Sequence, residues 1–518
     1  MTPLITDSMT AFTAAPSRAR TALHHRGAGA AEAPSAATGN QPVARSVVPC
    51  RLLARAGAVA GLCTLLAACS TAPPYTPPAA PVPAAFKEAS ATWMPAAPAD
   101  AMDRGPWWEM FGDAELNRLA AQVQLSNQNI AAAVAAYSQA QAVVRQERAG
   151  LLPGVRLSGG ASRAGGEGAS RSGTSTQATL AADWAPDLWG RLAGSITSAQ
   201  ASAQASEADL ASARLSASGT LASAYFQLRE ADAELALLDA TVQGYERNLQ
   251  IARNRYAAGV VAETDVLQAR TQLVNAQADM ASVRQNRSRL EHAMAVLTGQ
   301  PPAAFAVAPA LAWSAQVPPV PLSVPSALLQ RRPDIAAAER AVAAANAQIG
   351  IQRAAYFPSI SLGASLGSGG GSVADLFRAS TSVWSLGLSV AQTLFDAGAT
   401  AARVQEAESS RDARVARYRQ TVLEAFQGVE DQLAALRTLH EQEPLRREAV
   451  AAADRAAQQQ INRYRAGQVS YSEVVAAQAS ALSAQRALLQ LQVNRQLAAV
   501  ALVQALGGGW QARWQPQP

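Results

Sequence analysis

The fold is decided by a stretch that the sequence contains twice, Arg255-Tyr256-Ala257-Ala258-Gly259 and Arg463-Tyr464-Arg465-Ala466-Gly467. Upstream, Asn129-Ile130 and three alanines lead to Pro153, and Asp334-Ile335 and three alanines lead to Pro358. The offsets are 208 residues (467 − 259) and 205 residues (358 − 153). A near-constant offset, far longer than a solenoid period, predicts a duplicated unit with the same order of elements in each copy.

Composition narrows the class of protein. The 518 residues carry a mild formal charge of +5, and aromatic residues make up only 5% of the chain. Abundant alanine, glutamine and arginine favour long helices with small side chains at their contacts. No basic face interleaved with aromatic residues follows the N-terminal region, so no nucleic-acid partner is expected.

The N-terminal region has the order of a secretory signal. Arg45, Arg51 and Arg55 precede an apolar run from Ala56 to Leu66, which is too short to span a bilayer but suits a signal peptide. We therefore expect a signal region over residues 1–68. Residues 1–44 are either an unusually long leading segment or lie ahead of the true start, and the second interpretation is favoured.

The signal region ends in Leu66-Ala67-Ala68-Cys69-Ser70, which resembles a bacterial lipobox. The resemblance implies lipidation of Cys69 and, with Ser70 next to it, sorting to the outer membrane. Cleavage there would remove Cys50 and Cys63, so no disulfide is expected. The Pro- and Ala-rich residues 69–105 are predicted to form an extended, lipidated tether.

Each half contains two segments with a period of two. Ile360, Leu362, Ala364 and Leu366 alternate with serine and glycine, and the second segment and the weaker first copy behave alike. We predict strands at about 154–163, 176–187, 359–368 and 382–394, long enough to cross a bilayer. A half-buried sheet in a soluble domain is the alternative, but the small polar second face favours a water-filled lumen.

Four strands cannot close a barrel, and an open sheet edge is not tolerated in lipid. If these strands lie in a membrane, the chain must oligomerise. Two chains would supply about eight strands, which leave little lumen, and three would supply about twelve.

Long helices follow each strand pair. The segments 191–256 and 400–464 are expected to run as helices that turn at Gly259 and Gly467, although Pro444 should kink the second. Residues 262–298 and 470–506 return at heptad spacing. The first repeat thus covers 106–300, the second covers 322–510, residues 301–321 link them, and 511–518 form a tail.

Three motifs resemble the TolC/OprM family of outer-membrane efflux proteins and its NodT-like lipoprotein branch. They are Trp107-Trp108-Glu109-Met110-Phe111-Gly112-Asp113-Ala114-Glu115-Leu116, then Leu329-Gln330-Arg331-Arg332-Pro333-Asp334-Ile335 with Ala355-Tyr356-Phe357-Pro358, and Ala505-Leu506-Gly507-Gly508-Gly509-Trp510. The resemblance implies a mostly α fold with a membrane β-barrel. Three chains would build a 12-stranded barrel and a periplasmic α-helical tunnel.

The same resemblance implies a function. The homotrimer would be the exit duct of a tripartite pump for drugs or other small molecules, docked on a periplasmic adaptor and indirectly on an inner-membrane RND transporter. It would sit in outer-membrane lipid, perform no chemistry and need no cofactor or metal.

The resemblance places the gate and the adaptor-docking site at the helix turns. The docking residues would be Tyr256, Gly259, Val260, Gly467 and Gln468, and the gate residues would be Thr264, Asp265, Tyr464 and Glu473. Two positions depart from the family pattern, because Val469 replaces an arginine of TolC and Ala476 an aspartate. The lock is then either looser or uses Arg463 or Arg465 instead.

Asp265 and Glu473 lie at equivalent positions, nine residues after Tyr256 and Tyr464. Threefold symmetry would turn each into a ring of carboxylates, which favours cations. The alternative is that both are ordinary first-turn acids stabilised by the helix dipole.

The sequence is less consistent with three other functions. An enzyme is disfavoured, because no HExxH, GxSxG or P-loop motif occurs and His292 and His440 each stand alone. A periplasmic coiled-coil adaptor needs neither the duplication nor the strand pairs. A type I secretion duct is closer, but the lipobox and Arg331-Arg332-Pro333-Asp334 favour the pump branch.

Overall fold

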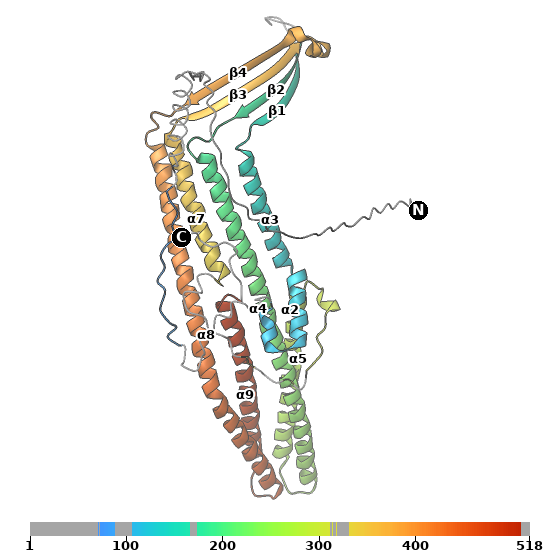
Figure 1. The fold of residues 1–518 in the computed structure, drawn as a ribbon. Coiled ribbons are helices and arrows are strands. Elements are labelled where there is room, and N and C mark those ends of the chain that lie inside the picture. The colour runs from blue at the N-terminus through green and yellow to red at the C-terminus, as the bar shows by residue number, and fades with distance from the viewer. Residues whose placement is uncertain are drawn as a thin grey trace, which may run out of the picture. The chain divides into compact units, whose positions relative to one another are not determined.

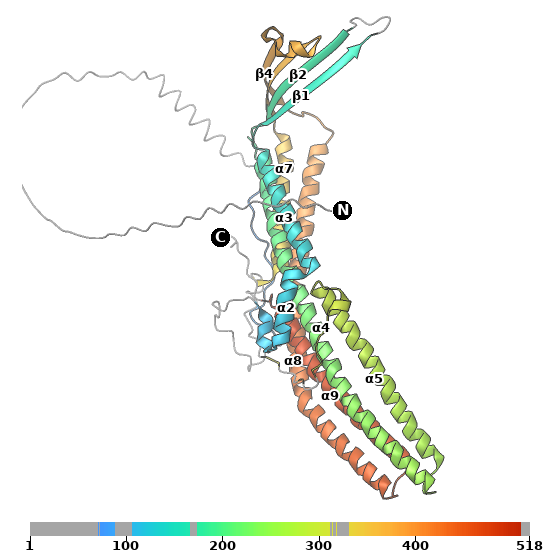
Figure 2. The ribbon, with the colours of Figure 1, turned by 90° about the vertical axis from the view of Figure 1, so that its right-hand side faces the viewer.

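A computed structural model describes Thr71 and residues 73–88, 106–165, 173–310, 313, 317–318 and 331–508. All of them belong to one compact unit, Thr64–Pro518. The signal region, Cys69, most of the second half of the linker and the tail lie outside the described residues. Within this unit the strands form a sheet at one end of the long helices, and the helix turns lie at the other end (Figures 1 and 2).

The order of elements repeats along the chain. The first copy consists of η1 (Trp107–Phe111), α2 (Ala114–Ser126), α3 (Gln128–Ala149), β1 (Gly154–Ala164), β2 (Gly173–Trp184), α4 (Arg191–Ala257) and α5 (Glu263–Leu297). The short η2 (Pro302–Ala304) follows. The second copy consists of α7 (Pro333–Arg353), η3 (Ala354–Tyr356), β3 (Ser359–Gly370), η4 (Val373–Phe377), η5 (Ala379–Thr381), β4 (Ser382–Ala391), α8 (Ala399–Arg465) and α9 (Tyr471–Ala505).

The two strand pairs join into one antiparallel sheet with the order β1-β2-β3-β4. The register puts Leu157 opposite Leu180, Leu180 opposite Leu366, and Leu366 opposite Trp384. One face of the sheet is therefore apolar across all four strands, as the alternation predicts. The other face carries small polar pairs such as Ser365 with Ser385, whose hydroxyl oxygens lie 2.8 Å apart.

Two strands end earlier than predicted. β2 ends at Trp184 rather than near 187, and β4 ends at Ala391 rather than near 394. Pro186 explains the first difference, because proline has no N–H to donate to a neighbouring strand.

The long helices differ from the predicted segments by no more than a residue at either end. Each of α4 and α8 has 67 residues, or about 100 Å of helix at 1.5 Å per residue. The turns that follow are alike in both copies. Gly259 and Gly467 adopt left-handed φ values of 71° and 73°, and the next amides donate to Arg255 O and Arg463 O at 2.9 Å.

The segment from Ala114 to Gly150 contains no proline but consists of two helices, because Asn127 is extended and its side chain accepts from the amides of Asn129 and Ile130. The helix α8 is continuous through Pro444, where the sequence predicts a kink. Only the hydrogen bond that residue 444 would donate to the His440 carbonyl is lost there.

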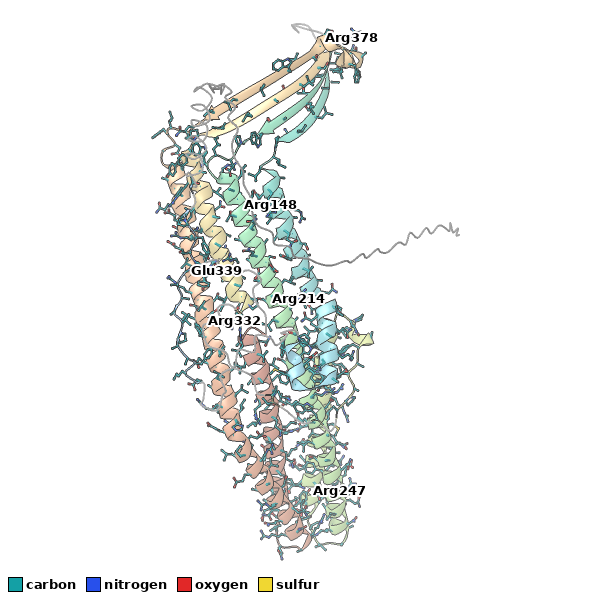
Figure 3. All side chains as sticks on the ribbon, in the orientation of Figure 1. Arg148, Arg214, Arg247, Arg332, Glu339 and Arg378 are labelled. Carbon is teal, nitrogen blue, oxygen red and sulfur yellow. The ribbon has the colours of Figure 1, made fainter. Side chains whose placement is uncertain are left out.

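The described part of the tether is extended, and side chains fasten it to α7 and α8. Thr71 Oγ1 donates to Trp189 O and Gly350 O at 2.9 and 3.0 Å. Tyr75 donates to Glu339, which Figure 3 labels on α7. At the far end, the amides of Lys87 and Glu88 donate to the carboxylate of Glu430 on α8.

The core lies where α2, α4, α8 and α9 meet. Among its fully buried side chains are Tyr225, Phe226, Leu228, Leu433 and Val500. Close to it, Asp232 forms ion pairs with Arg229 and Arg287 at 3.0 and 2.6 Å. Within the described ranges, no helix combines the length and hydropathy that a membrane span requires.

Candidate gate and docking turns

Both helix turns lie at the end of the helices that is remote from the sheet (Figures 1 and 2). The first turn joins α4 to α5, and the second joins α8 to α9. Since these four helices come from both copies, contacts between the two turns connect the halves of the duplication.

The turns are joined by a hydrogen bond between two of the predicted gate residues. Tyr464, on the last turn of α8, is only 4% exposed. Its hydroxyl donates to Asp265 Oδ2, on the first turn of α5, at 3.2 Å. Asp265 of the first copy and Tyr464 of the second copy, both predicted as gate residues, are therefore in contact.

An arginine that the sequence analysis did not select completes this contact. The guanidinium carbon of Arg255 lies 4.8 Å from the centre of the Tyr464 ring, which is cation–π geometry. Its Nη1 donates to the carbonyl of Tyr464 and, at 3.3 Å, to that of Arg465. The sequence pointed to Arg463 or Arg465 as the arginine of the lock. Arg255 could have been found as well, because it is the counterpart of Arg463 in the first copy.

A small apolar cluster encloses this contact. Tyr471 meets the Tyr464 ring edge-on at 5.1 Å. Leu249, Ala252, Ala269 and Val474 bury the pair. Burial, followed by the charge of Asp265, raises the pKa of Tyr464 to about 12. The hydroxyl thus keeps its proton, and remains a donor, over the physiological pH range.

The other predicted gate residues take no part in this contact. Thr264 and Glu473 are exposed on the first turns of α5 and α9. The predicted docking residues Tyr256, Gly259, Val260, Gly467 and Gln468 are also exposed. The turns thus combine a buried Tyr464–Asp265 contact with an exposed rim.

The contact between the turns consists of hydrogen bonds and ring packing. In the part of the chain that the structure describes, no three His, Cys, Asp or Glu side chains gather in a way that could hold a metal ion. The groups that meet are a tyrosine, a carboxylate and a guanidinium, and they can hold two helix ends together or release them.

The same fold occurs in solved outer-membrane channels. The chain is 30% identical to the outer-membrane channel OprN, with a TM-score of 0.75, and the match covers 86% of this chain and 100% of OprN. The fold therefore defines an outer-membrane channel.

Curated relatives lead to the same class. The outer membrane protein TtgC of Pseudomonas putida, named for a probable efflux pump, is 33% identical over 455 residues, which are 86% of this chain and 94% of TtgC. The cation efflux system protein CusC of Escherichia coli is 29% identical over 464 residues, 89% of this chain and 99% of CusC.

The family model described as outer membrane efflux protein matches residues 119–300 and again residues 324–508. The chain belongs to this family, and it acts in efflux at the outer membrane. The resemblance drawn from the sequence motifs is confirmed at this level, and each of the two matches falls on one copy of the duplication.

Proposed function

We propose that the chain is the exit duct of a tripartite efflux pump. It passes drugs or other small molecules from an inner-membrane RND transporter and a periplasmic adaptor to the exterior. The observation that carries this proposal is a four-stranded sheet with two unpaired edges, β1 and β4, continuous with two long helical hairpins. The outer strands of such a sheet have backbone N–H and C=O groups without partners until another strand pairs with them.

Three copies complete the sheet in the proposed assembly. Each supplies four strands, and edge β4 of one chain pairs with edge β1 of the next to give twelve strands. The apolar face suits lipid, because Leu157, Trp384 and Leu386 are all more than 70% exposed in the single chain. The serine, threonine and glycine face then lines a wet lumen.

The lipid anchor at Cys69 fits this placement. Thr71 binds the carbonyls of Trp189 and Gly350. Trp189 in turn donates to Pro358 O at 2.6 Å and stacks on Phe357, at the entrance to β3. The tether thus starts at the sheet end of the helices, which supports an acyl chain at the membrane face.

In this assembly the turns form the periplasmic mouth. Tyr464 and Asp265 hold it closed, Thr264 and Glu473 lie on its rim, and the exposed turns at Tyr256–Val260 and Gly467–Gln468 receive the adaptor. The duct contributes no energy source and no reaction, and cargo selection belongs to the pump.

Reconstitution tests the proposal directly. We expect an oligomer that migrates as a trimer on unheated gels, as a monomer after heating, and that conducts ions in planar bilayers. A chain that stays monomeric and forms no channel would overturn it. A photo-crosslinking residue at Val260 or Gln468 should capture the adaptor, whereas one at Val296, which is 66% exposed at the opposite end of α5, should not.

A further inference from the structure

The contact that joins the two turns uses only half of the groups that the duplication provides. Arg255, Tyr464 and Asp265 meet within one chain. Their counterparts, 208 residues away in the sequence, are Arg463 (463 − 255), Tyr256 (464 − 256) and Glu473 (473 − 265). The chain thus carries an arginine, a tyrosine and a carboxylate at equivalent positions a second time.

This second set is exposed. Tyr256 is 47% exposed, whereas Tyr464 is 4% exposed. Arg463 and Glu473 are exposed, while Arg255 and Asp265 are partly buried. Among the described residues, we find no hydrogen bond or ion pair made by the side chains of these three exposed residues.

The contact within one chain runs from the first copy to the second, which explains why Arg463, Glu473 and Tyr256 have no equivalent contact. In the first copy, Arg255 and Asp265 flank the α4–α5 turn, and both act on a tyrosine of the second copy. In the second copy, Arg463 and Glu473 flank the α8–α9 turn in the same way. The first copy of their own chain contacts the second copy through Tyr464, while its Tyr256 is left exposed. An equivalent contact for Arg463 and Glu473 therefore takes its tyrosine from the first copy of another chain.

We propose that Arg463 and Glu473 of one chain hold Tyr256 of a second copy of this chain, as Arg255 and Asp265 hold Tyr464. This inference rests on the proposed assembly of three chains around one duct. The Tyr256 hydroxyl donates to the Glu473 carboxylate, and the Arg463 guanidinium covers the ring and donates to the Tyr256 carbonyl. The mouth is then closed by contacts that alternate within and between chains.

The two kinds of contact differ in strength because the copies differ next to the tyrosine. Tyr464 packs on Tyr471, whereas the position equivalent to Tyr471 in the first copy is Glu263 (471 − 208). Tyr256 therefore lacks an aromatic neighbour that would exclude water, and its hydrogen bond is more hydrated. The contact between chains is the weaker one and opens first.

Pairs of cysteines bridged by a short bismaleimide test the geometry. In the full-length protein, Tyr256→Cys with Glu473→Cys should yield cross-linked dimers and trimers on denaturing gels. Tyr464→Cys with Asp265→Cys should yield only a monomer of altered mobility. Each single cysteine variant controls for reaction at Cys69.

The outcomes separate the inference from the function on which it rests. If the unheated protein migrates as a trimer and conducts, but the Tyr256–Glu473 pair gives no cross-linked ladder, the contact between chains is wrong and the duct stands. If the protein neither trimerises nor conducts, the proposed function fails together with the inference.

Conductance gives a second readout. Glu473→Ala should raise the open fraction of single channels about threefold, as expected for the loss of one hydrated hydrogen bond. Glu473→Gln, which still accepts a hydrogen bond from tyrosine, should stay closer to the parent protein. Equal open fractions for the parent protein and Glu473→Ala would contradict the proposal.

Discussion

At the scale of single residues, the decisive feature is the different environment of two equivalent tyrosines. Tyr464 is buried against Tyr471 and bonded to Asp265, while Tyr256 is half-exposed. A hydrogen bond to a carboxylate is worth more when water is excluded, because the acceptor is charged and the local dielectric is low. In the proposed duct, the closed mouth is therefore held most strongly at Tyr464.

We expect Tyr464→Phe to weaken the closed mouth. The ring and its contact with Tyr471 remain, and only the hydroxyl that donates to Asp265 is lost. A cost of about 1 kcal/mol corresponds to roughly a fivefold larger open population. Single-channel recording measures this, with Tyr356→Phe, which is remote from the turns, as the control. An unchanged open fraction would remove Tyr464 from the gate.

Glu230 on α4 predicts a dependence of stability on pH. Burial, followed by the charge of Glu234, raises its pKa from 4.5 to about 7. Between these values the folded state binds more protons than the unfolded state, so the stability contribution is present below pH 4.5 and is lost as pH rises through about 7. Glu230→Gln should therefore lose less thermal stability than the parent protein between pH 4.5 and 8.

The control for Glu230 is Glu246→Gln, an exposed glutamate on the same helix. Its unfolding midpoint should follow the parent protein at every pH. Parallel profiles for Glu230→Gln and the parent protein would show that burial of Glu230 contributes nothing to the pH dependence.

At the scale of elements, the C-terminal ends of α5 and α9 are held at equivalent positions of the two copies by different side chains. The carbonyl of Leu297, at the end of α5, accepts from Asn127 Nδ2 at 2.8 Å. The equivalent carbonyl of Ala505, at the end of α9, accepts from Arg332 Nη1 at 3.0 Å. Figure 3 labels Arg332 at the start of α7. The motif that most clearly marks the family thus has a structural role at this joint.

A glycine follows each of these helix ends at a left-handed φ, 69° at Gly299 and 91° at Gly507. A β-carbon at Gly299 would collide with the Ser126 carbonyl, and one at Gly507 with the Arg331 carbonyl. Backbone atoms cannot move aside as a flexible side chain can. Glycine is therefore required at Gly299 and Gly507 for two reasons, the left-handed φ and the close approach of a neighbouring backbone.

We expect Gly299→Ala to destabilise the fold by more than about 2 kcal/mol, since left-handed strain alone costs about 1–2 kcal/mol and the backbone collision adds to it. Gly112→Ala is the matched control, because Gly112 has a φ of 65° but open space around it. Denaturant unfolding of the detergent-solubilised protein compares the two variants. Equal losses would mean that the collision is relieved at no cost.

At the scale of the whole molecule, β1 and β4 are the outer strands of the sheet, and in the proposed assembly they pair with other copies of the chain. In the proposed trimer, Asp265 and Glu473 each recur three times around the mouth. Closely spaced carboxylates in a narrow, wet opening attract cations and repel anions.

Asp265→Ala combined with Glu473→Ala should therefore lower the cation selectivity of the open channel. Reversal potentials in asymmetric salt measure this ratio independently of how often the channel opens. The neutral isosteres Asp265→Asn and Glu473→Gln should lower it equally, because only the charge matters. An unchanged ratio in both double variants would mean that the carboxylates act only as first-turn helix acids.

Sequence reasoning succeeded where the signal was local. The strand alternation around Leu366, the turn at Gly259 and the lengths of α4 and α8 follow from periodicity and from glycine and proline positions. The helix break at Asn127 is less evident from the sequence, because asparagine also occurs within helices and the Leu297 carbonyl that accepts from its Nδ2 is 170 residues away.

The duplication, the order of elements and the family can be read from the sequence, because they depend on patterns along the chain. Which arginine and which tyrosine of the two Arg-Tyr pairs are joined becomes evident only in the folded protein. Arg255-Tyr256 and Arg463-Tyr464 share the same local conformation at the end of a helix. They differ in the residue seven positions further on, Glu263 in the first copy and Tyr471 in the second, and in which distant hairpin packs against them. Packing between hairpins far apart in the sequence depends on the folded chain as a whole.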